Sequence, residues 1–175
     1  MKLEKIDDIF ETNSQIREKL KTTLAQMSSE DHSLNREGGW TVSQILEHIA
    51  LVDEGMSKIC AMLLKQARIE ELSADGSVEF SDGFLQNAAG LATQKLAAPD
   101  VVKPVQNLSV EAAITRLDEN QKRFDRLREL FAIFDSTQHK YPHPYLGPIS
   151  AQEWLFLRGQ HEARHIKQME KVVEK

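Results

Sequence analysis

The chain has 175 residues, of which 41% are hydrophobic and 28% are charged, so it is expected to fold as a single domain over residues 1–175. Its formal net charge of -5 argues against a nucleic-acid or anionic-membrane partner, because phosphate groups are recognised by basic faces. A single cysteine, Cys60, excludes an internal disulfide, and the absence of a signal-like segment or of an apolar run of ~20 residues favours the cytoplasm.

Four segments carry hydrophobic residues at helical spacing, and no segment shows sustained strand alternation. The first predicted helix runs from about Lys5 to Met27. The second starts after Thr41, where Gln44 three positions later completes a capping box, and it ends near Leu72. Its apolar residues recur in steps of three and four, which is typical of a bundle seam.

Residues 73–108 form a long connection with several glycines and prolines, and FLQNAAGLATQKLA within it is compatible with a short helix. The third main helix is predicted to start after Ser109, and Gln121 lies in its seam where an apolar residue is expected. HKYPHPYLGPIS is predicted as a loop. The fourth helix starts after Ser150, with Glu153 completing a second capping box. These elements predict an all-α four-helix bundle with a long connection between its second and third main helices.

The fourth predicted helix carries His161 and His165 in the middle of its apolar stripe. Side chains four residues apart on a helix point the same way, so two imidazoles can converge on one ion. Separate hydrogen bonding in the core is the simpler interpretation of one inward histidine, but two at this spacing favour a metal site. His48 is the best placed of the remaining histidines. Three histidines from two helices would leave open positions on the ion, as in catalytic sites.

The stretch HEARH also reads as H-E-x-x-H, the pattern of a zinc protease helix. The metzincin continuation needs Gly and His where this chain has Gln168 and Lys171. Glu162 lies ~80° from the centre of the histidine stripe and is interpreted as an exposed residue, not a general base. A metalloprotease is therefore the third-ranked alternative.

Three stretches carry a resemblance to the DinB-like proteins, which include the YfiT-like metal-dependent hydrolases. GGWTVSQILEHI resembles their second helix, PDVVKPVQNLSVEAAITRL resembles the segment leading into their third, and HPYLGPISAQEWLFLRGQHEARHIKQMEKV resembles their last. The resemblance implies a four-helix bundle that holds a divalent ion, commonly zinc or nickel, on His48, His161 and His165. It also implies a homodimer. Relatives of known activity mostly join a low-molecular-weight thiol to an electrophile, or isomerise a substrate with such a thiol as cofactor.

The leading interpretation is a thiol S-transferase or hydrolase that acts on a small-molecule electrophile through a metal-bound thiolate or water. Its catalytic residues are unassigned. Residues that are candidates to orient the histidines are Glu47, Gln121, Arg158 and Gln168. Residues that are candidates for the pocket rim are Tyr141, His143 and Tyr145. For each of these a solvated or bundle-bridging side chain is the simpler interpretation. The alternative is a non-catalytic metal-binding, ligand-sensing or stress-related interaction protein.

Overall fold

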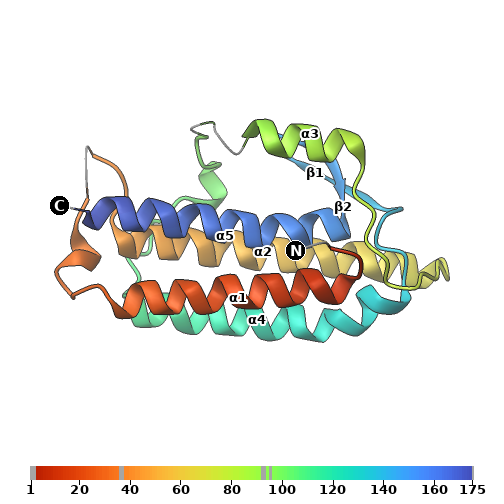
Figure 1. The fold of residues 1–175 in the computed structure, drawn as a ribbon, viewed down its shortest axis with the longest axis horizontal. Helices are drawn as coiled ribbons and strands as arrows, with labels where there is room; N and C mark the ends of the chain where they lie inside the picture. The colour runs from red at the N-terminus through yellow and green to blue at the C-terminus, as the bar shows by residue number, and fades with distance from the viewer. Residues whose placement is uncertain (1–2, 36–37, 92–93, 95, 175) are drawn as a thin grey trace.

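Four long helices form the body of the protein (Figure 1). The computed structural model describes residues 3–35, 38–91, 94 and 96–174. The bundle helices are α1 (Ile6–Ala25), α2 (Val42–Ile69), α4 (Val110–Ile133) and α5 (Ala151–Val173). α1 and α5 run in one direction and α2 and α4 in the other (Figure 1). The predicted bundle, with its long connection after the second main helix, is confirmed. None of the described helices is long and apolar enough to cross a membrane.

Side-chain caps fix the starts of the two helices that carry the candidate ligands. At the start of α2, the Gln44 backbone N–H donates to Thr41 Oγ1 (3.2 Å) and the Thr41 N–H donates to Gln44 Oε1 (3.0 Å). At the start of α5, the Ser150 N–H donates to Glu153 Oε2 (2.8 Å). Both predicted helix starts are therefore confirmed, and each satisfies backbone groups that the first helical turn leaves unpaired.

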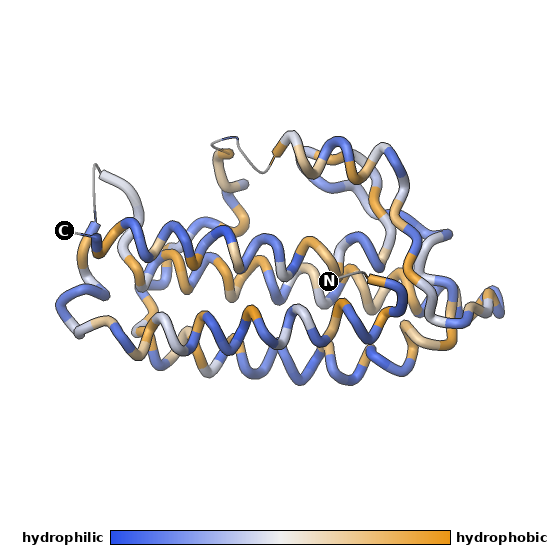
Figure 2. The backbone as a smooth tube through the Cα atoms, in the orientation of Figure 1, coloured by the Kyte–Doolittle hydropathy of each residue, from blue (hydrophilic) through white to orange (hydrophobic). Residues whose placement is uncertain are grey.

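The bundle core consists of two apolar clusters separated by a polar layer. Hydrophobic and hydrophilic residues alternate along each of the four helices (Figure 2). One cluster includes Phe10, Leu64, Phe124, Phe131 and Leu155. The other includes Leu20, Ile45, Ile49, Leu117 and Ile166. Between them lie buried polar side chains from all four helices: Asn13, Arg17, Asp53, Asn120, Arg158 and Glu162.

The long connection contains two further helices, α3 (Asp82–Leu91) and the 3-10 turn η2 (Asp100–Val102), and a similar turn η1 (Asp31–Ser33) precedes α2. α3 lies outside the bundle (Figure 1). It packs on α5 through Phe84 and Phe156, whose ring centroids are 6.0 Å apart. The short helix suggested over residues 84–97 is therefore confirmed as far as Leu91; residues 94, 96 and 97 are not helical, and residues 92–93 and 95 lie outside the described residues.

The segment before α5 is a two-stranded antiparallel hairpin of β1 (Lys140–His143) and β2 (Gly147–Ser150). The partners across it are Lys140 with Ser150, Tyr141 with Ile149, Pro142 with Pro148, and His143 with Gly147. The prediction of a loop was wrong here, because four-residue strands that each contain a proline give no alternation signal. Gly147 adopts a φ of 71°, which glycine reaches without the strain of a Cβ.

Candidate metal centre

Three histidines from two helices bring their ring nitrogens together. His161 Nε2 lies 3.1 Å from His48 Nε2 and 3.1 Å from His165 Nε2. One ligand atom from each histidine lies within 4.8 Å of those of the other two. Three nitrogens bound to one ion at ~2.0–2.1 Å would be roughly 2.9–3.3 Å apart, depending on whether the geometry is octahedral or tetrahedral. The spacing of these nitrogens therefore fits a shared ion.

Two of the rings are oriented by hydrogen bonds on their far side. His48 Nδ1 donates to the backbone oxygen of Val102 (2.8 Å), and His165 Nδ1 donates to Gln168 Oε1 (2.7 Å). A neutral imidazole carries one proton, so these two rings present bare Nε2 atoms to the centre of the cluster. Outer-shell acceptors of this kind commonly fix the rings of metal-binding histidines. The structure thus places Gln168 where the sequence analysis expected an orienting residue.

The arrangement leaves one lone pair without a proton to face. His161 Nε2 lies between the bare nitrogens of His48 and His165, and if it carries a proton it can donate a full hydrogen bond to only one of them. The remaining bare nitrogen then lies 3.1 Å from His161 Nε2 without a hydrogen directed at it, and if His161 Nε2 carries no proton both contacts join two acceptors. A cation removes this conflict, because all three lone pairs can point at it. The donor set therefore fits a divalent metal ion.

Burial keeps the three rings neutral. Desolvation lowers the pKa of His48, although its hydrogen bond to Val102 opposes the change. Desolvation and the neighbouring His165 and His48 hold the pKa of His161 well below 6.5. Desolvation likewise lowers the pKa of His165 to about 4. At neutral pH no proton has to leave these rings before a metal ion binds.

The connection between α2 and α4 is held against α2 beside His48. The Glu47 carboxylate accepts backbone N–H bonds from Val105 (2.8 Å), Gln106 (2.7 Å) and Leu108 (3.2 Å). Glu47 therefore fixes the connection rather than a histidine ring. Val102, whose backbone oxygen accepts from His48, lies three residues before Val105. Glu47 therefore acts on His48 indirectly, by holding the backbone of the connection. The Trp40 ring packs on His48 as well, at a centroid distance of 4.9 Å.

Two of the other candidates lie in the polar layer and not beside the histidines. Arg158 Nε donates to Asp53 Oδ1 (2.6 Å), and Arg158 Nη2 donates to Gln121 Oε1 (2.7 Å). The guanidinium lies over the Phe124 ring, 4.3 Å from its centroid. Among the contacts of the described residues, neither Arg158 nor Gln121 reaches a histidine of the cluster. Arg158 and Gln121 therefore bridge helices, which was the simpler interpretation of these residues in the sequence.

Glu162 is buried, with 2% of its surface exposed, so the expectation that it is exposed was wrong. It points to α1, where Arg17 Nε and Nη2 each donate to one carboxylate oxygen at 2.7 Å. The physical reason is that α5 packs against both α1 and α2, so a residue ~80° from the histidine stripe still faces a neighbouring helix.

The predicted rim residues lie on the hairpin before α5. The His143 ring packs on Trp154 with a centroid distance of 5.0 Å, and Tyr141 lies 6.5 Å from the same indole. Tyr141 and Tyr145 are more exposed, at 41% and 42%. The Tyr145 hydroxyl donates to the backbone oxygen of Ala97, which joins the hairpin to the long connection.

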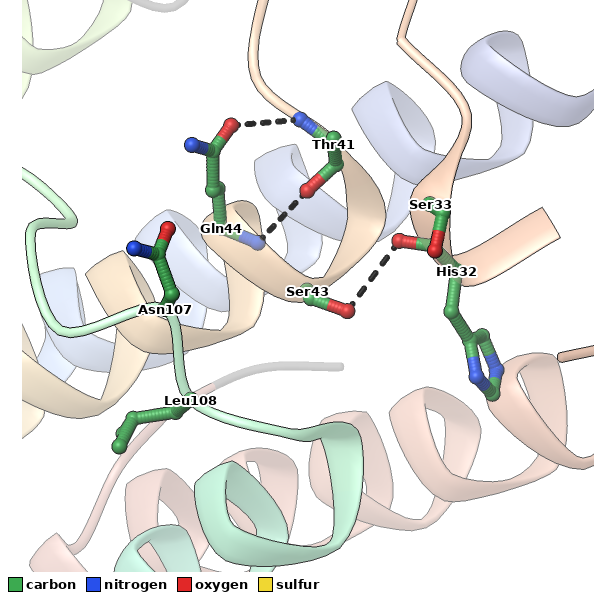
Figure 3. Close-up of a pocket in the computed structure, with 7 residues that line it drawn as sticks. All are labelled: His32, Ser33, Thr41, Ser43, Gln44, Asn107 and Leu108. Carbon is green, nitrogen blue, oxygen red and sulfur yellow. Dashed lines mark hydrogen bonds between the residues drawn. The ribbon is translucent and has the colours of Figure 1, made fainter. Parts of the chain in front are cut away.

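A separate pocket of about 230 Å³ lies at the start of α2 (Figure 3). Two of its lining residues, Thr41 and Gln44, hydrogen-bond to each other in the capping box. A third, Ser43, donates from Oγ to the His32 backbone oxygen (3.1 Å). His32 is half-buried there. A second pocket, of about 190 Å³, lies between residues 74–79 and 131–137. Neither pocket is lined by a histidine of the cluster.

Comparisons with known proteins agree with the fold and with the family resemblance. The family model of the DinB superfamily matches residues 12–169. The uncharacterized protein YuaE of Bacillus subtilis (strain 168) is 24% identical over 154 residues, which are 83% of this chain and 86% of that protein. The crystal structure of TT2238, a four-helix bundle protein, shares the fold with a TM-score of 0.64 at 22% identity, over 95% of this chain and 98% of that one. On this evidence the chain belongs to the DinB superfamily.

Proposed function

We propose that this chain is a metal-dependent enzyme that holds one divalent ion, zinc or nickel, on His48, His161 and His165. Its substrate would be a small electrophile, and its reaction the transfer of a low-molecular-weight thiol to that electrophile, or hydrolysis. An ion in such a site lowers the pKa of a thiol or water in a remaining coordination position, so that the nucleophile is available near neutral pH.

The main support for this proposal is the conflict between lone pairs where the three Nε2 atoms meet. Two of these nitrogens are bare because Val102 and Gln168 take the protons on the far side of the rings. Histidines that only filled the core would be expected to have hydrogen-bond partners, because buried polar groups are normally hydrogen-bonded. Lone pairs that point at one another do not meet this expectation. Three protein ligands also leave coordination positions for other molecules, as catalytic metal sites do.

Side chains near the cluster hold the connection between α2 and α4 in place. Arg164, next to His165, donates to the backbone oxygens of Leu91 (3.1 Å) and Gln94. Tyr145 holds Ala97 in the same way. Glu47 and Arg164 thus fasten the connection to the two helices that carry the histidines, and Tyr145 fastens it to the hairpin. They would orient a small molecule and limit the access of water to it.

The attacking thiol is expected to come from solution. Cys60 is fully buried, and desolvation raises the pKa of its thiol far above the ordinary value. A buried neutral thiol is a poor nucleophile. A reducing compartment such as the cytoplasm, in which small thiols are abundant, suits this reaction.

A non-catalytic metal-binding or stress-related interaction protein is the second candidate. It is favoured by one observation: neither of the two pockets described above is lined by the histidine cluster. In this role the ion would stabilise the fold, and the remaining coordination positions would hold water alone.

The enzymatic proposal is tested with protein purified without a histidine tag and reloaded with zinc or nickel. Cysteine and glutathione would each be offered with a panel of small electrophiles, and mass spectrometry would detect the thioether or hydrolysis product. We expect product with loaded wild type, and none above background with metal-free protein or His161→Ala. His139→Ala is the matched control, because His139 lies outside the cluster and contacts Glu70 (3.1 Å). Equal turnover by His161→Ala and wild type would contradict the proposal.

We also propose that two chains associate as a homodimer. Val101 and Val105 are 87% and 74% exposed, and both lie on the connection that passes His48. Apolar side chains this exposed are suited to a protein interface. Light scattering at micromolar concentration should give twice the chain mass, and a monomer would contradict this proposal.

A further inference from the structure

One ring nitrogen of His143, the last residue of β1, is available to bind a ligand. Its Nδ1 accepts the backbone N–H bonds of Tyr145 and Leu146, both at 3.2 Å. The proton of the neutral ring must therefore sit on Nε2. Desolvation lowers the pKa of His143 to about 4, so the ring is neutral at pH 7. Within the described part of the chain no protein acceptor contacts Nε2, so its N–H can bind water or a ligand.

The ring is placed beside the histidine cluster. It packs on Trp154 at 5.0 Å between centroids, and Trp154 lies seven residues, or about two turns, before His161 on the same face of α5. His143 is also close enough that a proton on its ring would lower the pKa of His161. The hairpin thus places the His143 ring near the cluster, and Tyr145 fastens the tip of the hairpin to Ala97.

A fixed positive charge acts on the cluster, although the chain as a whole is acidic. Of the groups that lower the pKa of His161, Arg164 is charged at pH 7 and the histidines are neutral, and no carboxylate is among them. Arg164 donates to two backbone oxygens, Leu91 O and Gln94 O, and has no carboxylate partner among the ion pairs of the described residues. Its positive charge is therefore not neutralised. A bound divalent ion would add to this field, which favours an anionic ligand.

We propose that His143 binds the carboxylate of the small-molecule substrate through its Nε2–H, in the positive field of Arg164. This inference rests on the proposed function, because it places the other end of the substrate at the metal ion. It narrows the substrate class to small molecules that carry a carboxylate in addition to the sulfur or oxygen atom that faces the ion. His143 is a binding residue in this account and transfers no proton.

The test compares two probes of similar size on cobalt-loaded protein, whose visible absorption changes when a thiol binds. 3-Mercaptopropionate carries a carboxylate and 1-propanethiol does not. A hydrogen bond to a charged group is expected to make wild type bind 3-mercaptopropionate about 10- to 100-fold more tightly than 1-propanethiol. In His143→Phe, which keeps a ring against Trp154, most of this preference should be lost, and only the part that comes from the field of Arg164 and the ion should remain. His143→Gln, which supplies an N–H donor, should recover part of the preference.

His139→Phe is the control and should keep the wild-type preference. A wild type without preference for 3-mercaptopropionate, or a His143→Phe variant that retains the preference, would overturn the inference while the metal site stands. A wild type that holds no cobalt would overturn the proposed function and this inference together.

A measurement on wild type alone covers the case in which His143→Phe does not fold. Nitrogen-15 spectra of the zinc-loaded protein should show His143 protonated at Nε2 and bare at Nδ1. The Nε2–H resonance should shift when 3-mercaptopropionate is added, and not when 1-propanethiol is added. A resonance that stays in place with both probes would overturn the inference.

Discussion

Arg17 and Glu162 form a bidentate ion pair inside the bundle, with both N–O distances at 2.7 Å and side-chain exposures of 4% and 3%. Glu162 directly follows His161 in the chain. The pair therefore joins α1 to the residue beside a candidate metal ligand. α5 cannot turn about its axis without breaking both hydrogen bonds, so the pair fixes the direction in which His161 faces.

Replacing Arg17 with Met should lower the free energy of unfolding by ~3–5 kcal/mol, because Glu162 and Asp53 would lose their shared buried partner. Urea denaturation measures the change. Arg128→Met is the matched control, since its pair with Asp7 is exposed at 48% and 67% and should contribute little. Equal losses in the two variants would show that the buried pair does not hold the bundle.

Glu162→Gln should bind metal as wild type does, and any activity should change little, although the variant should be less stable. The carboxylate faces Arg17 on α1 and is not available as a base at the cluster. Metal titration, turnover and thermal denaturation of the variant test these three points. A fall in turnover of ~10²-fold or more, the size expected for a general base, would reinstate the protease-like interpretation of HEARH.

The metal-free protein should lose stability as the pH falls from about 6.5 to about 4, as far as the histidines contribute. In this window an unfolded histidine binds a proton, whereas folded His165 does not until the pH reaches its lowered pKa of about 4. The unfolded state thus holds more protons, and stability rises with pH. His165 alone accounts for roughly 3 kcal/mol of this change. His165→Leu should flatten the pH dependence in urea denaturation, and an unchanged slope would contradict the assignment.

Glu47→Gln should loosen the connection around Val105 and Leu108, because an amide oxygen cannot replace a carboxylate that accepts three N–H bonds. We expect faster hydrogen exchange in residues 102–108, equivalent to ~1–3 kcal/mol of lost protection. Metal affinity should fall as well, since Val102 would no longer hold His48 firmly. Exchange at the wild-type rate would show that the clamp is held by other contacts.

The four bundle helices were predictable because each one is specified by local information. The spacing of apolar residues gives the helix, and the boxes at Thr41 and Ser150 give two of the starts. The closeness of His161 and His165 could also be predicted from local information, since a helix places residues four apart on one face. Periodicity identified His48 as the best-placed third histidine, but its place beside the other two came from the family resemblance, because periodicity alone does not say which helices are neighbours.

The polar layer was missed for the same physical reason. Arg17 and Glu162 are 145 positions apart, and each alone looks like an ordinary charge on an amphipathic helix. The available signal was weak: Asp53 and Arg158 fall close to the apolar stripes of their helices, where a charge has to be paired. Likewise, the sequence placed Gln121 in a seam, whereas the side chain that is fully buried is its neighbour Asn120, bonded to the Ala50 oxygen (2.9 Å).

Metal titration of the chelated protein measures whether His48, His161 and His165 hold one ion. Wild type and the variants His48→Ala, His161→Ala and His165→Ala would be titrated with zinc and with nickel, in competition with a chromophoric chelator, and His139→Ala would serve as control. We expect about one ion per chain for wild type and for His139→Ala, and strongly weakened binding in each of the other three variants. Unchanged stoichiometry and affinity in those three variants would contradict the proposed site.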